Sequence, residues 1–327
     1  RTSTAPEGGL VVDDDGPSDF DTVGAAVAAA SSGQTIMVRS GNYSESGVTI
    51  SKPVTIKGQG DGTVIDGEGS KVFLLAANDT TIADLTIRNG GRGAISVDRP
   101  TEVGNFTAEG VNILGTEIGV YVQGNSPNAE SDANGYFRNS TFRDVVLIDS
   151  ERKGLYIEKA SDLLIEDVVV DGVTSDTYGY NNGIDVNLKD GDYEDITIRD
   201  TVVAGVERGG ASPATFSTGI AIKARDDGGT YGAMPASLEG VHLDNVTVVD
   251  SYNGLRFGEV GVVNQNLTNV TARQLRFLDN EGYQIQFESE SVRPEAAAIA
   301  GNGTYDNGAI ALNDSSDTPV PVGTPTI

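Results

Sequence analysis

Five polar residues in the middle of the chain have types and spacing that could do chemistry together. Glu158, Asp185 and Asn187 offer oxygen donors, and Lys223 and Arg256 follow them further along the sequence. Carboxylate and amide oxygens are the ligands that hard cations such as Ca²⁺ prefer. A lysine can accept a proton when its charged form is destabilised, and an arginine can bind a carboxylate through two parallel N–H groups. These residues act together only if the fold stacks their segments side by side.

A repeated segment, in which a glycine opens a short strand, indicates such stacking. The repeats are 26 to 36 residues apart, and the opening glycines are Gly93, Gly119, Gly154, Gly183, Gly219, Gly254 and Gly282. Further short strands fill each repeat, for example DLLIEDVVVDGV at 162–173, with Asn, Asp and Gly between them. Asn and Asp tolerate left-handed turns, and glycine permits a positive φ or a close chain approach. Short strands without helices, in units of about 30 residues, indicate a solenoid.

Alternation within each of these strands predicts which side chains face outward. The first and third residues after the glycine are mostly apolar and are expected inside, so the second and fourth are expected outside. Stacked coils would place them in two columns, with neighbouring rungs about 4.8 Å apart. The second-residue column is Ile95, Tyr121, Tyr156, Asp185, Ala221, Arg256 and Gln284. The fourth-residue column is Val97, Gln123, Glu158, Asn187, Lys223, Gly258 and Gln286.

The two ends of the chain differ from the repeats. Residues 19–30 are Ala-rich, and Phe20, Val23 and Val27 recur at helical spacing, with Ser18 or Asp19 as the expected N-cap. A helix there would cover the open end of a solenoid. We therefore expect an N-terminal extension at 1–17, the solenoid with its cap helix at 18–312, and a Pro/Thr-rich tail or linker at 313–327.

The run from the Ala-rich segment through SGNYSES (40–46), KPVTIKGQG (52–60) and TVIDG (63–67) resembles a known opening. It looks like that of right-handed parallel β-helix proteins, which include pectin methylesterases, NosD-type periplasmic proteins that mature copper sites, and many polysaccharide lyases. The likeness extends through the Gly-led coils to about residue 312. It implies an all-β fold, a right-handed single-stranded parallel β-helix. The catalytic motifs of pectin methylesterases, polygalacturonases and mannuronan epimerases are not found in the sequence.

The outward columns resemble the catalytic face of calcium-dependent β-helix polysaccharide lyases. That resemblance implies calcium at Glu158, Asp185 and Asn187, Lys223 as the base, and Arg256 binding the substrate carboxylate. Cleavage would then be β-elimination on a uronate-containing glycan. The residues expected to bind sugar are Tyr121, Gln123, Tyr156, Arg225, Gln284 and Gln286. Three longer insertions, 124–137, 174–183 and 224–237, would wall the groove.

Other interpretations of the same face stay open. Outward positions of any solenoid strand are polar, so the columns could be a passive ladder whose charges satisfy one another. The protein would then be a non-catalytic cell-surface or viral module for glycan binding, adhesion or assembly. A third possibility is a glycoside hydrolase with paired carboxylates, for example Glu158 with Asp185.

The composition excludes several classes of function. The 327 residues include 22 Lys+Arg and 48 Asp+Glu, a net charge of −26, so cations to bind a nucleic-acid backbone are lacking. There is no Cys and one His, which excludes disulfides, a thiol nucleophile and a His-rich metal centre. No apolar run is long enough to span a membrane. The dense acidity is similar to that of proteins from salt-loving organisms, so we expect a halophilic protein of haloarchaeal character.

The location and the partner follow from weaker signals. Nine Asn-x-Ser/Thr sequons, at Asn42, Asn78, Asn105, Asn139, Asn245, Asn266, Asn269, Asn302 and Asn313, accompany the absence of Cys. Together they favour an extracellular or cell-surface glycoprotein. The expected partner is an acidic polysaccharide or a cell-surface glycan, with calcium as the cofactor.

Overall fold

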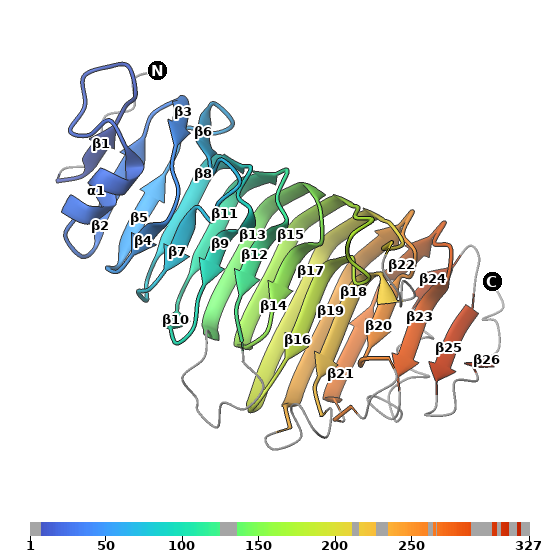
Figure 1. The fold of residues 1–327 in the computed structure, drawn as a ribbon. Helices are drawn as coiled ribbons and strands as arrows, with labels where there is room; N and C mark the ends of the chain where they lie inside the picture. Colours follow the sequence, from blue (N-terminus) through green and yellow to red (C-terminus); the bar gives the residue numbers. More distant parts are fainter. Residues whose placement is uncertain are drawn as a thin grey trace.

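A computed structural model describes residues 8–124, 136–210, 216–226, 235–260, 264–265, 267–288, 303–305, 309–313 and 319–321. The chain winds as a right-handed parallel β-helix in which two long sheets run along the solenoid (Figure 1). All strand pairs are parallel except one at the C-terminal end. The fold expected from the repeats is confirmed.

The first sheet, sheet A, contains fifteen strands. They are β1 (Leu10–Val12), β2 (Gln34–Val38), β3 (Gly41–Ser44), β5 (Val54–Lys57), β6 (Thr63–Asp66), β8 (Thr81–Arg88), β10 (Glu102–Gly104), β11 (Thr107–Leu114), β13 (Tyr136–Ser150), β15 (Ala160–Val173), β17 (Asp192–Val206), β19 (Ser237–Val249), β21 (Leu267–Arg273), β22 (Leu275–Leu278) and β24 (Gly303–Tyr305).

The second sheet, sheet B, contains eleven strands and holds the Gly-led segments. They are β4 (Val48–Ile50), β7 (Phe73–Leu75), β9 (Arg92–Val97), β12 (Ile118–Val122), β14 (Lys153–Ile157), β16 (Asn182–Leu188), β18 (Thr218–Ala224), β20 (Leu255–Phe257), β23 (Tyr283–Glu288), β25 (Ala309–Asn313) and β26 (Pro319–Pro321).

The core is a set of aligned apolar columns inside the coils. One column of sheet B runs through Ile95, Val120, Leu155, Ile184, Ile220, Leu255 and Ile285, all at most 1 % exposed. Phenylalanines stack in the same way, as Phe257 and Phe287 do with ring centroids 5.5 Å apart. Burial of these columns drives the stacking of successive coils.

The glycines near the start of β12, β14, β16 and β18, and the one just before β20, are required by close packing. A Cβ built on Gly154 would lie 2.6 Å from the carbonyl oxygen of Gly183 and 2.9 Å from a methyl group of Val170. Gly154 does not have a positive φ, so the close chain approach explains it. A larger residue there would push the next coil away.

Asn and Asp occupy left-handed positions at the corners of the coils, as the sequence predicted. Asp79, Asn105 and Asn139 have φ between 49° and 56° on three successive coils. Asn105 Nδ2 donates to Asp79 Oδ1 at 2.7 Å, and Asn139 Nδ2 donates to Asn105 Oδ1 at 2.6 Å. The corner residues therefore permit the turn and also link one coil to the next.

Helix α1 (Val23–Ala29) packs against β1, β2 and β4 at the N-terminal end of the solenoid (Figure 1). It is shorter than the expected 19–30 segment, and its N-cap is Thr22 rather than Ser18 or Asp19. The Glu45 carboxylate accepts hydrogen bonds from the first free amides of the helix, at Val23 and Gly24. Phe20 instead forms a β-bridge with Val12, so the helix begins only after this residue.

The ends of the chain contain strands that the sequence analysis left out. β1 lies within the expected extension 1–17 and forms the first rung by pairing with β2. β26 lies within the expected tail 313–327 and pairs antiparallel with β25. Among the described residues, no helix has the length and apolar character needed to cross a membrane.

Candidate functional site

Strand register brings the five residues with chemical potential onto one face. Asp185 on β16 is aligned with Tyr156 on β14 and with Ala221 on β18, and Ala221 is aligned with Arg256 on β20. Asn187 is aligned with Lys223 on β18 in the same way. Glu158 directly follows β14, so all five residues lie on four successive rungs of sheet B. We call this region, from β12 to β23, the sheet B face.

The sheet B face is enclosed, although its side chains point away from the core of the coil. Asp185 and Arg256 are 0 % exposed, Lys223 is 2 % exposed, and Glu158 and Asn187 are 4 % exposed. Side chains on the outer side of a solenoid are expected to be solvated. Charged groups removed from water require partners, so the ion pairs of this face decide its chemistry.

One cluster of ion pairs is centred on Asp185. Its carboxylate forms an ion pair with Lys153 at the start of β14, and its Oδ1 lies 3.0 Å from Lys223 Nζ. Lys223 Nζ also lies 2.7 Å from Glu259 Oε2, which in turn lies 3.4 Å from Arg225 Nη1. The Lys153 ammonium stands 4.0 Å from the centre of the Tyr156 ring.

Burial and these charges shift the acidities in opposite directions. Burial lowers the pKa of Lys153 to about 8, although the Asp185 carboxylate acts against this shift. Burial alone would raise the pKa of Asp185, but Lys153 and Lys223 outweigh it and hold that pKa far below its usual range. Burial would also raise the pKa of Glu259. The charges of Lys223, Arg256 and Arg225 outweigh burial and lower this pKa to about 2. Both carboxyl groups are therefore ionised at neutral pH.

A second cluster is centred on Glu158. It forms an ion pair with Lys189 and accepts a hydrogen bond of 2.7 Å from the Gly124 amide. Tyr121 and Tyr156 stack with ring centroids 5.1 Å apart, and the Tyr121 hydroxyl lies 3.5 Å from Glu158 Oε2. The two rings are 4 % and 7 % exposed, so they contact each other and are not presented as an open platform for a sugar ring.

Arg256 differs from the other cations of the face. Its Nη1 donates to the carbonyl oxygen of Phe216 at 2.8 Å, and its guanidinium lies 5.8 Å from the centre of the Phe216 ring. Its Nε and Nη2 are buried and have no hydrogen-bond partner among the described residues. Its neighbours in the column are Ala221 and Gln286. Two buried donors thus remain unsatisfied on the same edge of the guanidinium.

The predicted columns are wrong in two coils, by one residue in the Gly93 coil and by two residues in the Gly282 coil. In the Gly93 coil, Ile95 and Val97 face inward and are 0 % exposed, and Ser96 takes the place beside Tyr121. Ala94 stands where the other coils have their glycine, so the alternation begins one residue later than expected.

The Gly282 coil is offset by two residues, so that Ile285 and not Tyr283 is aligned with Leu255. Gln286, not Gln284, is aligned with Arg256. Gln284 stands opposite Gly254, and its Oε1 accepts a hydrogen bond of 2.7 Å from Asn280 in the preceding turn. Gln284 therefore does not belong to the sheet B face.

The remaining sequence-predicted residues have identified places. Gln123 follows β12 and is half-buried beside Glu158. Arg225 follows β18, and its Nη1 donates to Asn187 Oδ1 at 3.3 Å. Of the expected groove insertions, 174–183 is described in full, and there Tyr178 lies against Arg152, 4.8 Å from the guanidinium carbon to the ring centre. Residues 125–135 and 227–234 of the other two insertions lie outside the described residues.

The sequence analysis missed three lysines of this face. The chain has seven lysines, at 52, 57, 71, 153, 159, 189 and 223, and the last four are each at most 6 % exposed. Lys153 stands just before the coil glycine, where it is aligned with Asn182 and Thr218. Alternation continued backwards across Gly154 would have placed Lys153 inside the coil with Leu155, so this pattern could not find it. Lys159 and Lys189 stand in the turns after β14 and β16, where strand alternation predicts nothing.

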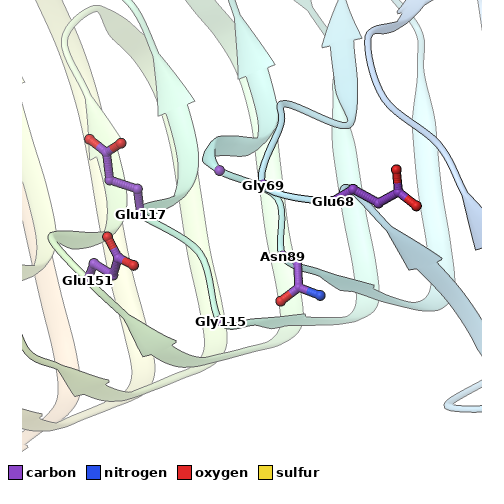
Figure 2. Close-up of a pocket in the computed structure, with 7 residues that line it drawn as sticks. Glu68, Gly69, Asn89, Gly115, Glu117 and Glu151 are labelled. Atoms are coloured by element: carbon purple, nitrogen blue, oxygen red, sulfur yellow. The ribbon is translucent and has the colours of Figure 1, made fainter.

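A pocket of about 420 Å³ lies at a different place, the corner where the chain enters sheet B. Figure 2 shows the Glu117 and Glu151 side chains on neighbouring coils, with Glu68 and Asn89 further along the same corner. Glu117 Oε1 lies 3.9 Å from Arg92 and 3.8 Å from Arg152. The pocket is acidic and open, and it contains none of the five residues discussed above.

Comparisons with known proteins show similarity to solved structures only. Neither a family model nor a curated protein sequence matches the chain. An alginate lyase from Paenibacillus sp. str. FPU-7 is 14 % identical, with a TM-score of 0.48 over 80 % of this chain and 92 % of that one. The catalytic domain of a GH87 alpha-1,3-glucanase is 14 % identical, with a TM-score of 0.47 over 91 % and 68 %.

A third similar structure is a pectin methylesterase from carrot, which is 14 % identical, with a TM-score of 0.40 over 94 % of this chain and 91 % of that one. The printed names describe enzymes that act on polysaccharides. At these identities and TM-scores, they carry no argument about the activity of this chain.

Proposed function

We propose that the sheet B face binds an acidic polysaccharide and cleaves it at a uronate residue by β-elimination, outside the cell. The observation that carries this proposal is Arg256, which is fully buried while its Nε and Nη2 lack acceptors among the described residues. These N–H groups form one edge of a planar guanidinium, a geometry that matches the two oxygens of a carboxylate. A buried cation with free donors gains most from an anionic ligand.

Gln286 adds an acceptor next to that guanidinium. Its Nε2 donates to Glu288 Oε1 at 2.5 Å, while its buried Oε1 has no donor among the described residues. A ligand that satisfies both Arg256 and Gln286 must combine a carboxylate with a nearby hydroxyl group. Uronate sugars have this combination, and neutral sugars lack the carboxylate.

The elimination needs a base, and Lys153 suits this role better than Lys223. Burial brings the pKa of Lys153 to about 8, so a useful fraction of its amine is neutral near pH 7 to 8. The neutral amine would remove the proton from the carbon next to the uronate carboxylate. The electrons of that C–H bond would form the new C=C bond as the bond to the glycosidic oxygen breaks, and solvent would protonate the leaving oxygen. Arg256 would stabilise the charge that develops on the carboxylate.

Hydrolysis by paired carboxylates has less support from this face. Such an enzyme needs one carboxyl group that stays protonated at working pH, which requires a raised pKa. The pKa values of Asp185 and Glu259 are lowered by the surrounding lysines and arginines. These two groups are suited to hold cations in place and not to donate a proton.

Calcium does not fit the three residues for which the sequence predicted it. The Asp185 carboxylate already contacts two ammonium groups, and the Glu158 carboxylate contacts a third. The amide oxygen of Asn187 accepts from Arg225. We derive no step through calcium, and its role stays a prediction that a chelator tests.

An absorbance assay tests the proposed function. The protein is incubated at molar salt, where its surface charge is screened, with pectate, alginate or a glycosaminoglycan. β-Elimination gives an unsaturated product that absorbs near 235 nm. We expect this absorbance to rise with at least one uronate polymer and not with a neutral glucan, and to be unchanged by EDTA. No unsaturated product from any uronate polymer would contradict the proposal.

A non-catalytic glycan-binding or assembly module is the second candidate. The observation that favours it is the enclosure of the face, since Asp185 and Arg256 are 0 % exposed. The ion pairs would then serve to hold successive coils together. Binding of the same polymers without any rise in absorbance is the result expected for this candidate.

A further inference from the structure

Lys223 occupies an unusual position for a catalytic amine. Its Nζ lies between two carboxylates on different coils, 3.0 Å from Asp185 Oδ1 and 2.7 Å from Glu259 Oε2. Calcium in proteins lies 2.3–2.6 Å from several such oxygens. The ammonium group therefore stands where two carboxylates would otherwise share a metal ion, at a slightly longer contact distance.

The surroundings keep a second cation away from that position. Lys153 forms an ion pair with the same Asp185 carboxylate, and Arg225 Nη1 lies 3.4 Å from Glu259 Oε2. Arg256 also acts on the Glu259 charge. While the Lys223 ammonium is in place, a divalent ion next to Asp185 would meet that charge in addition to these positive groups in an enclosed site, where repulsion is poorly screened.

Lys223 and Lys153 differ in the number of charges that they neutralise. The Lys223 ammonium contacts two carboxylates, whereas for Lys153 the described contacts are one carboxylate and the Tyr156 ring. Lys223 is 2 % exposed and joins β18 to the neighbouring coils on both sides. Loss of its charge would leave Asp185 and Glu259 facing each other without a cation between them.

We infer that Lys223 is a built-in cation: its ammonium takes the place of a divalent metal ion between Asp185 and Glu259, so that the sheet B face works without metal. Lys223 is thus a positioning residue that holds the two carboxylates, and not the base. The part of this inference that concerns turnover rests on the proposed function. The part that concerns cation binding does not.

Calcium titration calorimetry without any substrate tests the inference directly. The carboxylate oxygens of Asp13, which is buried, and of the exposed Asp14 and Asp15 lie within 4.8 Å of one another, and this group could bind calcium by itself. All variants are therefore built on a background with Asp14→Asn and Asp15→Asn. We expect this background protein to bind no calcium at the face, and we expect Lys223→Met to gain one calcium site. Adding Asp185→Asn to Lys223→Met should abolish that site.

A matched control is Lys57→Met, which removes an exposed lysine that lies 3.2 Å from Asp84 on sheet A. It should gain no calcium site. The inference would be overturned if the background protein binds calcium and Asp185→Asn abolishes that binding. This measurement does not require any lysine variant to fold. Failure of a folded Lys223→Met variant to bind calcium would overturn it as well.

Turnover separates the positioning role from the role of a base, provided that the lyase activity exists. We expect Lys223→Met to lose at least 100-fold in kcat/KM and calcium to restore at least tenfold of that loss. Ethylamine, a small amine that replaces a missing base, should restore nothing. Rescue by ethylamine and not by calcium would overturn the positioning role. Absence of activity in the wild type would contradict only the proposed function, because the calorimetry measures calcium binding without substrate.

Discussion

The outer faces of the two sheets carry ion pairs of opposite character. On sheet A, six residues in register alternate in sign across successive coils: Glu109, Arg143, Glu166, Arg199, Asp244 and Arg273. Arg143 Nε lies 2.7 Å from Glu166, and Arg273 Nη2 lies 3.0 Å from Asp244. The arginine side chains of these pairs are 43 % and 74 % exposed. Water competes for such pairs, so each contributes little.

On the sheet B face, side chains at equivalent outward positions are enclosed. Lys153, Asp185 and Lys223 are at most 3 % exposed, so removing one partner leaves an uncompensated charge out of water. The comparison shows that the direction of a side chain from the coil does not decide its chemistry. Enclosure decides it, because enclosure shifts pKa values and makes each charge depend on its partner.

The largest difference between the faces should appear when a central carboxylate is neutralised. Asp185→Asn leaves Lys153 and Lys223 without their shared partner, and we expect a loss of about 3–5 kcal/mol in the free energy of unfolding. Denaturant unfolding at fixed high salt measures this loss. The matched control on sheet A is Glu166→Gln, for which about 1 kcal/mol or less is expected. Equal losses for the two variants would remove the distinction between the faces.

Acid should weaken the sheet B face through Glu259. Its pKa is about 2 in the folded protein, below the usual value of 4.5, so its stabilisation is complete above about pH 4.5 and is lost as the pH falls towards 2. The shift corresponds to about 3 kcal/mol. We expect the unfolding temperature to fall over this range in the wild type and to fall less in Glu259→Gln. A parallel pH dependence of the two proteins would be evidence against this pairing.

The carboxylate-binding role of Arg256 can be tested by a conservative change. Arg256→Lys keeps the charge but loses the two parallel donors, and we expect kcat/KM on the cleaved polymer to fall about 100-fold. Arg273→Lys on sheet A is the control and should leave kcat/KM unchanged. If the two variants behave alike, the free edge of the Arg256 guanidinium has no role in binding.

The pH dependence of turnover tests Lys153 as the base. Since the neutral amine is required and its pKa is about 8, kcat/KM should rise about tenfold per pH unit below pH 8 and level off above it. Lys153→Met should remove this rise together with the activity, whereas Lys57→Met should change neither. A profile that levels off well below pH 7 would assign the base to another group.

The smallest effect is expected from salt. Screening acts on exposed charges and much less on enclosed ones. Raising the salt concentration should therefore reduce the stability difference between wild type and Arg199→Ala on sheet A, which is a few tenths of a kcal/mol at most. The difference between wild type and Asp185→Asn should stay nearly constant. The free energies of unfolding of wild type, Arg199→Ala and Asp185→Asn, measured at several salt concentrations, test this expectation.

Much of this architecture could be predicted from local rules. The Gly-led repeats and their alternation predicted the strands of sheet B, and they placed Asp185, Lys223 and Arg256 on one face. The prediction slipped by one residue in the Gly93 coil and by two residues in the Gly282 coil, because Ala94 and Gln284 stand where other coils have glycine. A single-residue offset reverses every side chain of a strand, and only the register shows it.

The chemistry of the face could be predicted less well. Alternation would have placed Lys153 inside the coil, and Lys189 and Glu259 stand in turns that have no strand period. Lys223 was predicted as the base and Asp185 as a calcium ligand. The structure places their charged groups 3.0 Å apart as an ion pair. No sequence pattern specifies a contact between coils at this level.

The sequence by itself determined the solenoid, because alternation, corner Asn and Asp, and close-packed glycines act over a few residues and repeat in every coil. It also determined that cations are scarce, with 22 Lys+Arg against 48 Asp+Glu. Only the tertiary structure decided that four of the seven lysines lie enclosed in one region and that two donors of Arg256 have no acceptor among the described residues. Burial and ion pairing depend on residues from different coils, and distances between coils are set only when the chain has folded.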